Sequence, residues 1–156
     1  MPQIGKLTTE AVQALIEAAL PWIINIDPFH TPKSQVNWNN LQAHYPQVHC
    51  GLKYSSGQQN AEITWDIVLA AGTWNFNLIH QQDTSMGIYT VQIDGVTIGT
   101  IDGYAGSTIE LAISSIAGFI ITATKKFELK LKMATKNGSS GSYVGNITSI
   151  QLLRTA

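Results

Sequence analysis

The side chains best suited to metal chemistry gather in the first third of the chain. Three of the four histidines and the only cysteine are His30, His44, His49 and Cys50. Imidazole and thiolate are good zinc ligands, but the spacing of these residues matches no standard paired-ligand motif. His49 and Cys50 would also point to opposite faces of a strand. We therefore expect no metal site.

Acidic residues offer a second kind of chemistry, because two suitably spaced carboxylates can hydrolyse a glycoside. Those from residue 66 onward are Asp66, Asp83, Asp94, Asp102, Glu110 and Glu128. A turn accounts for Asp94, and Asp66 and Glu128 fit solvent-facing strand positions. The sequence also has no Gly-x-Ser-x-Gly elbow and no phosphate-binding glycine loop. We therefore expect no catalytic residue, no cofactor and no enzymatic activity.

Aromatic side chains near amides and hydroxyls make carbohydrate binding harder to dismiss, because a ring face can pack against a sugar. Trp65 and Trp74 alternate in phase with apolar neighbours and are expected in the core. Tyr104 and Tyr143 lie in glycine-rich loops. These two tyrosines are the candidate ligand-facing residues, with ordinary packing as the alternative.

Such loops need a scaffold, and an Asp94-Gly95 turn between two alternating segments predicts a β-hairpin over residues 87–102. A two-residue turn defines one register, in which the apolar residues share a face. The expected pairs are Ile93 with Val96, Val91 with Ile98, and Tyr89 with Thr100.

Period-two alternation continues over most of the chain from about residue 61. The other expected strands cover residues 61–69, 74–78, 109–113, 119–124, 127–133 and 144–153. A phase slip near residues 145–147 indicates a β-bulge in the last strand. About eight short strands separated by turns predict an all-β fold, an antiparallel jelly-roll β-sandwich over residues 61–156.

Residues 1–60 are expected to form a separate segment, a short N-terminal helix followed by an extended aromatic arm. An apolar stripe at helical spacing ends at Pro21. A helix of about three turns needs a packing partner, which is either its own β domain or other copies of the chain. The candidate oligomer or anchor contacts are Val12, Leu15, Ile16, Ala19, Trp22, Phe29 and Trp38.

Charge is sparse: charged residues make up 12% of the chain, and the formal net charge is −1. Nucleic-acid binding needs a clustered basic surface, whereas Lys130 and Lys132 alternate with apolar residues as on the wet face of a strand. No apolar run approaches the roughly 20 residues of a membrane span, and residues 1–6 lack signal-peptide features. We expect a soluble protein that binds neither nucleic acid nor membrane. Its amide-rich surface suits a neutral partner, such as protein or sugar, or a structural lattice.

The segments 87–102, 127–137, 139–143 and 147–154 resemble the jelly-roll domains of bacteriophage virion proteins, which include head decoration proteins, head fibres and tail-fibre tips. The same pattern of strands is similar to that of carbohydrate-binding modules. The virion resemblance, over about residues 61–155, implies a homotrimeric capsid decoration, cement or head-fibre protein. Its partners would be the major capsid protein or another virion protein, in a virion assembled in the host cytoplasm. The alternative is a receptor- or carbohydrate-binding module that contacts a host-surface glycan.

Overall fold

The computed structural model describes residues 22–26, 32–44, 51–56 and 58–156, with the backbone alone for residues 39–44 and 51–56. Every regular element in these ranges is a β-strand, so the all-β prediction is confirmed. The predicted helix that ends near Pro21 and the arm residue Phe29 lie outside the described residues. No helix in the described ranges is long and apolar enough to cross a membrane.

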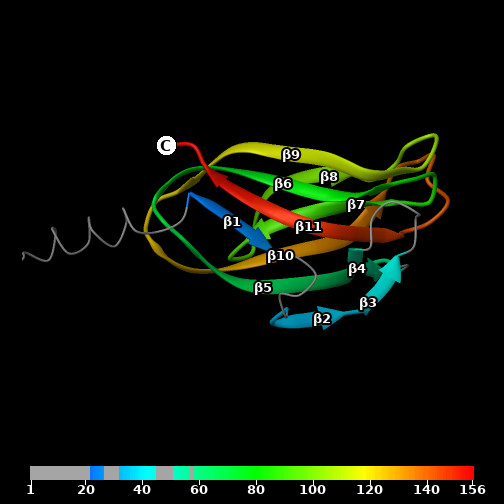
Figure 1. Ribbon diagram of the computed structural model, residues 1–156, viewed down its shortest axis with the longest axis horizontal. Coiled ribbons are helices and arrows are strands. Elements are labelled where there is room, and N and C mark those ends of the chain that lie inside the picture. Colours follow the sequence, from blue (N-terminus) through cyan, green and yellow to red (C-terminus); the bar gives the residue numbers. More distant parts are fainter. Residues whose placement is uncertain (1–21, 27–31, 45–50, 57) are drawn as a thin grey trace, which may run out of the picture.

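The strands form two antiparallel sheets that pack face to face (Figure 1). In the six-stranded sheet, the order is β3 (Asn39–His44), β4 (Gly51–Ser56), β11 (Gly145–Arg154), β6 (Gly72–Gln82) and β9 (Ile109–Ile121), with β1 (Ile23–Ile26) also paired to β11. In the five-stranded sheet, the order is β2 (Ser34–Val36), β5 (Ala61–Leu69), β10 (Lys125–Lys136), β7 (Gly87–Ile93) and β8 (Val96–Asp102).

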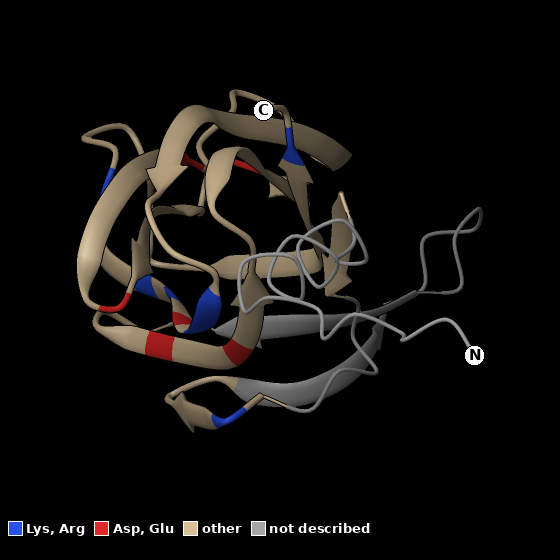
Figure 2. Ribbon diagram, turned by 90° about the vertical axis from the view of Figure 1, so that its left-hand side faces the viewer, with Lys and Arg blue, Asp and Glu red and all other residues tan. Residues whose placement is uncertain are grey.

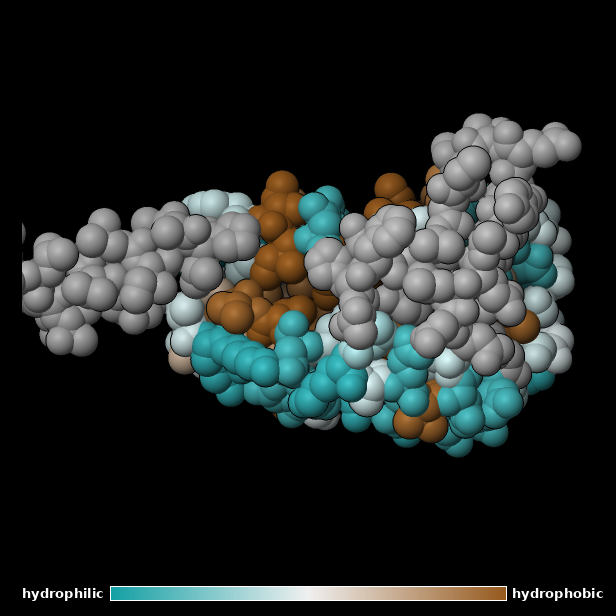
Figure 3. Space-filling model, turned by 60° about the horizontal axis from the view of Figure 1, so that its bottom comes forward, coloured by the Kyte–Doolittle hydropathy of each residue, from teal (hydrophilic) through white to brown (hydrophobic). Residues whose placement is uncertain are grey.

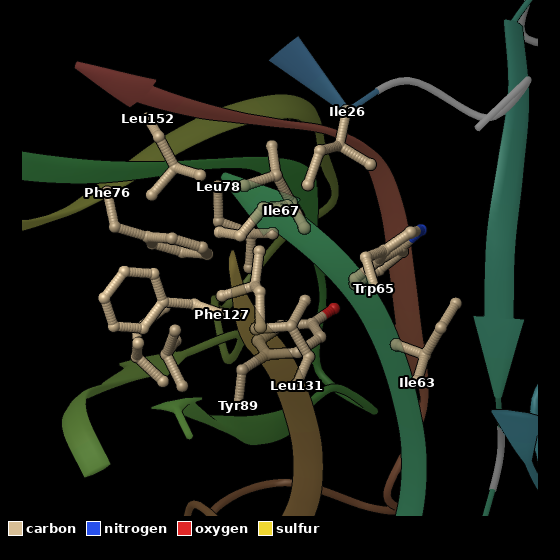
Figure 4. Close-up of a cluster of buried hydrophobic side chains, with 14 of the residues drawn as sticks. Ile26, Ile63, Trp65, Ile67, Phe76, Leu78, Tyr89, Phe127, Leu131 and Leu152 are labelled. Carbon is tan, nitrogen blue, oxygen red and sulfur yellow. The ribbon is translucent and has the colours of Figure 1, made fainter. Parts of the chain in front are cut away.

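The core lies between the sheets and takes every second side chain of the long strands. Figure 4 shows Phe76 and Leu78 of one sheet meeting Phe127 and Tyr89 of the other. Trp65 and Trp74 are also buried, as their phase predicted. Since side chains alternate between the two faces of a strand, this burial fixes which residues point outward.

The predicted Asp94-Gly95 turn is confirmed. Both residues have positive φ, 47° and 78°, as a two-residue hairpin turn requires. Turn geometry is not the whole role of Asp94, because its carboxylate accepts a hydrogen bond from the Glu128 amide (2.8 Å) and pairs with Lys125 (2.9 Å). These two contacts, the amide foremost, lower the pKa of Asp94. The turn is thereby fastened to β10.

The predicted hairpin register holds for Ile93 with Val96 and for Gln92 with Thr97, and it is wrong beyond them, because a β-bulge interrupts the ladder between residues 91 and 92. The observed pairs are Ile93 with Val96, Val91 with Gly99, and Tyr89 with Ile101. Tyr89 is buried, so the predicted register would have carried the Thr100 hydroxyl to the core side. The bulge places Ile101 there instead, where it is buried.

The predicted strands 109–113 and 119–124 are one strand, β9, which runs from Ile109 to Ile121. The residues between them break the apolar pattern, but hydrogen bonding to β6 carries the strand through. The predicted bulge in β11 is present and lies between Ile147 and Ser149.

Strands β1 to β4 fall in the segment that was expected to form an extended aromatic arm. Each has three to six residues. Prolines lie between β1 and β2 and between β3 and β4 in the sequence. Pairing with long strands holds them, β1 and β4 on β11 and β2 on β5. Such short strands gain their stability from tertiary pairing, which local alternation does not reveal.

His80 of β6 is a buried polar residue beside the core. Its Nε2 lies 2.9 Å from Ser114 Oγ and its Nδ1 lies 3.0 Å from the Gln81 carbonyl oxygen. The Tyr89 ring meets it edge-on at a centroid distance of 5.4 Å. Burial disfavours the charged imidazolium and lowers the pKa of His80 to about 4.

This low pKa predicts a stability change in a defined pH window. An unfolded histidine takes up a proton near pH 6.5 and folded His80 only near pH 4, so the free energy of unfolding should fall as pH drops through that interval. The whole loss should be about 3 kcal/mol. Urea unfolding at pH 7.0, 5.5 and 4.5 measures it. The variant His80→Gln should flatten this window, and an unchanged slope in that variant would contradict the assignment.

Candidate functional site

The outer face of the five-stranded sheet, which we call the charged face, carries lysines paired with acids. The pairs are Lys33–Glu128 (2.9 Å), Lys126–Asp66 (2.6 Å), Lys130–Glu62 (3.4 Å) and Lys132–Glu62 (3.0 Å). Figure 2 shows many of the charged positions on the five-stranded sheet. In Figure 3 the lower part of the surface is mainly hydrophilic. The predicted wet-face position of Lys130 and Lys132 is confirmed.

The pairing on the charged face leaves no cluster of one sign among the described residues. A hydrogen bond from Lys132 lowers the pKa of Glu62, and one from Lys126 lowers the pKa of Asp66. Exposed ion pairs of this kind contribute little stability each. The charged face is therefore a solvated surface whose carboxylates pair with lysines.

The opposite outer face, formed by β1, β11, β6 and β9, has a different chemistry. Glu110 and Arg154 are the only Asp, Glu, Lys or Arg residues in these four strands, and each lies near a strand end. His80 points inward. Amide, hydroxyl and aliphatic side chains therefore make up most of this surface, which we call the neutral face.

One residue from each strand forms a continuous hydrogen-bonded line across the neutral face. Ser115 Oγ donates to Asn77 Oδ1 (2.7 Å), Asn77 Nδ2 donates to Gln151 Oε1 (3.2 Å), and Gln151 Nε2 donates to Asn25 Oδ1 (3.2 Å). The strand register places these residues side by side. We call them the amide row.

The amide row keeps hydrogen-bonding capacity for a ligand. A primary amide has two N–H donors and an oxygen with two lone pairs. Asn77 and Gln151 each use one N–H donor and one oxygen lone pair within the row. Each therefore keeps one N–H donor and one lone pair for a ligand. The side chains are already oriented by their neighbours, so a ligand would lose less entropy in ordering them.

Aliphatic side chains border the amide row on both sides. Leu153 pairs with exposed Ile23 on one side, and Ile79 pairs with Ile113, which is 69% exposed, on the other. Each border also contains one polar residue, Asn75 beside Leu153 and Ser149 beside Ile79. A polar line with aliphatic groups on both sides suits a molecule that presents hydroxyls and C–H groups together, as sugars do.

A groove begins where the amide row ends at β1. It has a volume of about 450 Å³ and lies between β1 and β5, beside a hydrophobic area in Figure 3. Asn25 belongs both to the row and to the groove wall, and Trp65 and Ile67 line the groove from the other sheet. The neutral face thus continues over the β1 edge into a partly apolar recess.

Tyr104 and Tyr143, the predicted ligand-facing residues, lie at one end of the sandwich on either side of loop 83–86. The Asp83 amide donates to the carbonyl of the residue before Tyr104 (3.2 Å), and Val144 donates to a carbonyl of the loop (3.1 Å). Both tyrosines are half-buried. The structure brings the two loops together, and the role of the tyrosines in binding stays a prediction.

Tyr143 also has a packing role. Its side chain packs against the core, and Lys136 Nζ lies 5.4 Å from its ring centroid. Tyr104 is held through its backbone amide, which donates to Asp102 Oδ1 (2.9 Å). Both tyrosines therefore make contacts within their own chain, Tyr143 through its ring and Tyr104 through its backbone amide.

The structure describes two of the predicted oligomer or anchor contacts. Trp38 is buried in the core of its own chain. Trp22 is 54% exposed, and the Arg154 guanidinium lies 5.1 Å from its ring centroid. The remaining contacts, Val12, Leu15, Ile16, Ala19 and Phe29, lie outside the described residues, so their role stays a prediction.

The residues considered for zinc fall outside the described side chains: His30, His49 and Cys50 have no described position, and only the backbone of His44 is described. Among described residues, no three His, Cys, Asp or Glu side chains gather as metal ligands. Asp83 Oδ2 accepts a hydrogen bond from Thr108 (2.6 Å), which lowers the pKa of that carboxyl.

The sequence contained a signal for the amide row that the motif search did not use. Asn75 and Asn77 alternate with buried Trp74 and Phe76, which marks them as outward amides on an uncharged strand. Their partners on other strands are set by the tertiary register, which local patterns do not reveal.

No protein-family model matches the sequence, and no curated protein matches it. Solved structures match the fold. The CBM36-1 domain of a multidomain xylanase from the hindgut metagenome of Trinervitermes trinervoides has a TM-score of 0.63 and 18% identity, over 86% of this chain and 98% of that domain.

Two further structures are similar over most of the chain. Carbohydrate-binding module CBM36 in complex with calcium and xylotriose has a TM-score of 0.58 and 10% identity, over 83% of this chain and 98% of that one. Insecticidal crystal protein Cry2Aa has a TM-score of 0.60 and 14% identity, over 86% of this chain and 22% of that one. These likenesses support the predicted jelly-roll sandwich. They do not show a phage origin.

Ser140 joins two loops at the end of the sandwich that carries Tyr104 and Tyr143, and its contribution to stability can be tested. Its buried hydroxyl lies 2.7 Å from the Met86 carbonyl oxygen and 2.9 Å from that of Ser142. Removal of the hydroxyl by Ser140→Ala should lower the free energy of unfolding by about 1–3 kcal/mol, because buried carbonyls lose their partner. Urea denaturation measures this loss. The exposed neighbour variant Ser139→Ala should change stability by less than about 0.5 kcal/mol, and equal effects would contradict the assigned role.

Proposed function

We propose that this chain is a non-enzymatic carbohydrate-binding module whose neutral face holds the glycan. The amide row carries this proposal: four side chains from four strands form one oriented line of donors and acceptors, with aliphatic side chains on both sides. A sugar presents hydroxyls that donate and accept, together with apolar C–H groups. The row and its borders match both features.

The structural likenesses support this class of function without deciding it. Two of the similar structures are carbohydrate-binding modules, and one of these was solved with xylotriose. Cry2Aa shares the fold as an insecticidal protein, so the fold by itself does not select the ligand. The absence of charge from most of the neutral face is the stronger argument, since it favours an uncharged partner.

We assign no part of the binding to a metal ion. The xylotriose complex also contains calcium, but no group of three His, Cys, Asp or Glu side chains is assembled in the part of this chain that the structure describes. The amide row needs no ion to meet hydroxyl groups.

Capsid decoration, trimerisation and a virion location, which the phage resemblance implies, stay predictions. We rank carbohydrate binding ahead of them because the amide row is an observed surface suited to a glycan. The receptor- or carbohydrate-binding alternative is thus the better supported of the two interpretations.

The proposal predicts binding to neutral polysaccharides through the amide row. Native gels that contain soluble xylan, glucomannan or β-glucan should retard the wild-type chain in at least one case. The double variant Asn77→Ala/Gln151→Ala should weaken that binding at least about tenfold, because two pairs of ligand hydrogen bonds are lost. Isothermal titration with the retarding polysaccharide gives the magnitude.

Gln92→Ala provides the matched control for this experiment. Gln92 is an amide on the charged face, and its Nε2 donates a hydrogen bond to Thr97 Oγ1 (3.3 Å). Its replacement removes a surface hydrogen bond similar to those of the row and leaves the neutral face unchanged. It should bind like the wild type. A wild-type chain that none of these polysaccharides retards, or equal losses in both variants, would refute the proposal.

A further inference from the structure

We infer that the ligand is an extended, uncharged polysaccharide chain that lies across the strands, parallel to the amide row. This inference rests on the proposed function and adds the class of glycan, its direction and its minimum length. Ser115 on β9 and Asn25 on β1 mark the two ends of the described contact line.

The spacing of the row supports a repeating ligand. Neighbouring strands lie roughly 4.8 Å apart, so four side chains on adjacent strands span roughly 14 Å. One strand spacing is close to the length of one pyranose unit in an extended chain. About three consecutive sugars would therefore each meet a new side chain of the row.

Chemistry along the strands argues against the other direction. On β6, outward side chains change from Asn75 and Asn77 to Ile79 within five residues. On β11, Gln151 is followed by Leu153. A glycan laid along β6 would pass from Thr73, Asn75 and Asn77 to Ile79, and the hydrogen bonds of the row would not follow it, because they run only from strand to strand. A glycan laid across the strands keeps its hydroxyls on the amide row and its C–H groups over the aliphatic borders.

The charges near the row favour a neutral chain over an acidic one. Arg154 is the only Lys or Arg in β1, β11, β6 and β9. Its Nη2 donates to the Ala71 carbonyl oxygen (2.5 Å) and its guanidinium lies over Trp22. Arg154 is thus occupied, and these strands offer no other fixed cation to a uronic acid.

The groove beside Asn25 indicates where a longer chain would continue. It opens at the β1 end of the row, and its lining includes Asn25, Trp65 and Ile67. Lys33 and Asp66 also line it, and their charges are paired at 3.4 Å. At the other end, β9 is the edge of the sheet. The chain therefore leaves the row toward β1, where the aliphatic side chains of Ile24 and Val68 can pack against a further sugar.

Chain length and direction can be tested by titration calorimetry. The probes are neutral oligosaccharides of one to six units, cut from whichever polysaccharide binds the wild type, and a uronic acid oligomer of three units. Affinity should rise steeply up to three or four units and then level off. Ser115→Ala and Asn25→Ala, at the two ends of the row, should each weaken binding of the three-unit probe about threefold to tenfold.

Ser149→Ala tests the other direction, because Ser149 is a hydroxyl on the strand of Gln151, two residues along β11 and beside the row. It should weaken binding less than either end variant. Both end variants replace exposed residues and should fold, which thermal melting confirms. If Ser149→Ala loses affinity and the end variants do not, the chain lies along the strand and the inference is wrong.

Other results separate this inference from the proposed function. Binding that does not depend on chain length, or a preference for the uronic acid oligomer, would overturn the inference while carbohydrate binding stands. No binding to any probe would overturn both.

Discussion

The alternation of side chains along β6 and β11 is the constraint on which the other features depend. Trp74, Phe76 and Leu78 are fully buried, so the asparagines between them must point outward. A slip of one residue would exchange the two sets and bury amides without partners, at a cost of several kcal/mol. Packing of the core therefore holds the amide row in place.

The two outer faces show how one core can support two surfaces of different chemistry. On the five-stranded sheet, lysines and acids pair across β5 and β10, and water remains the main partner of these groups. On β1, β11, β6 and β9 of the six-stranded sheet, most outward residues are amides, hydroxyls and aliphatic groups, and the four polar residues of the amide row bond to one another. Among the described residues, this second surface carries a continuous line of oriented, uncharged donors and acceptors, which is why we place recognition there.

Much of the scaffold could be predicted, because the relevant signals are local. The Asp94-Gly95 turn, the buried tryptophans and the wet face of β10 all follow from turn chemistry and period two. The bulge at residues 91–92 was not predicted. The pairing of β7 with β8 beyond it depends on the burial of Ile101 in the core, which the turn residues do not determine. The four strands before residue 57 were missed because their stability comes from pairing with distant strands.

The sequence by itself determined the all-β class, the phase of the long strands and the small share of charge, since these depend on residue type and local alternation. Only the tertiary structure decided which outward residues meet. Asn25 and Gln151 are 126 positions apart, and Asn77 lies between them in the chain. Backbone ladders and a shared core place these amides in one line, because strand pairing acts between segments that no local pattern connects.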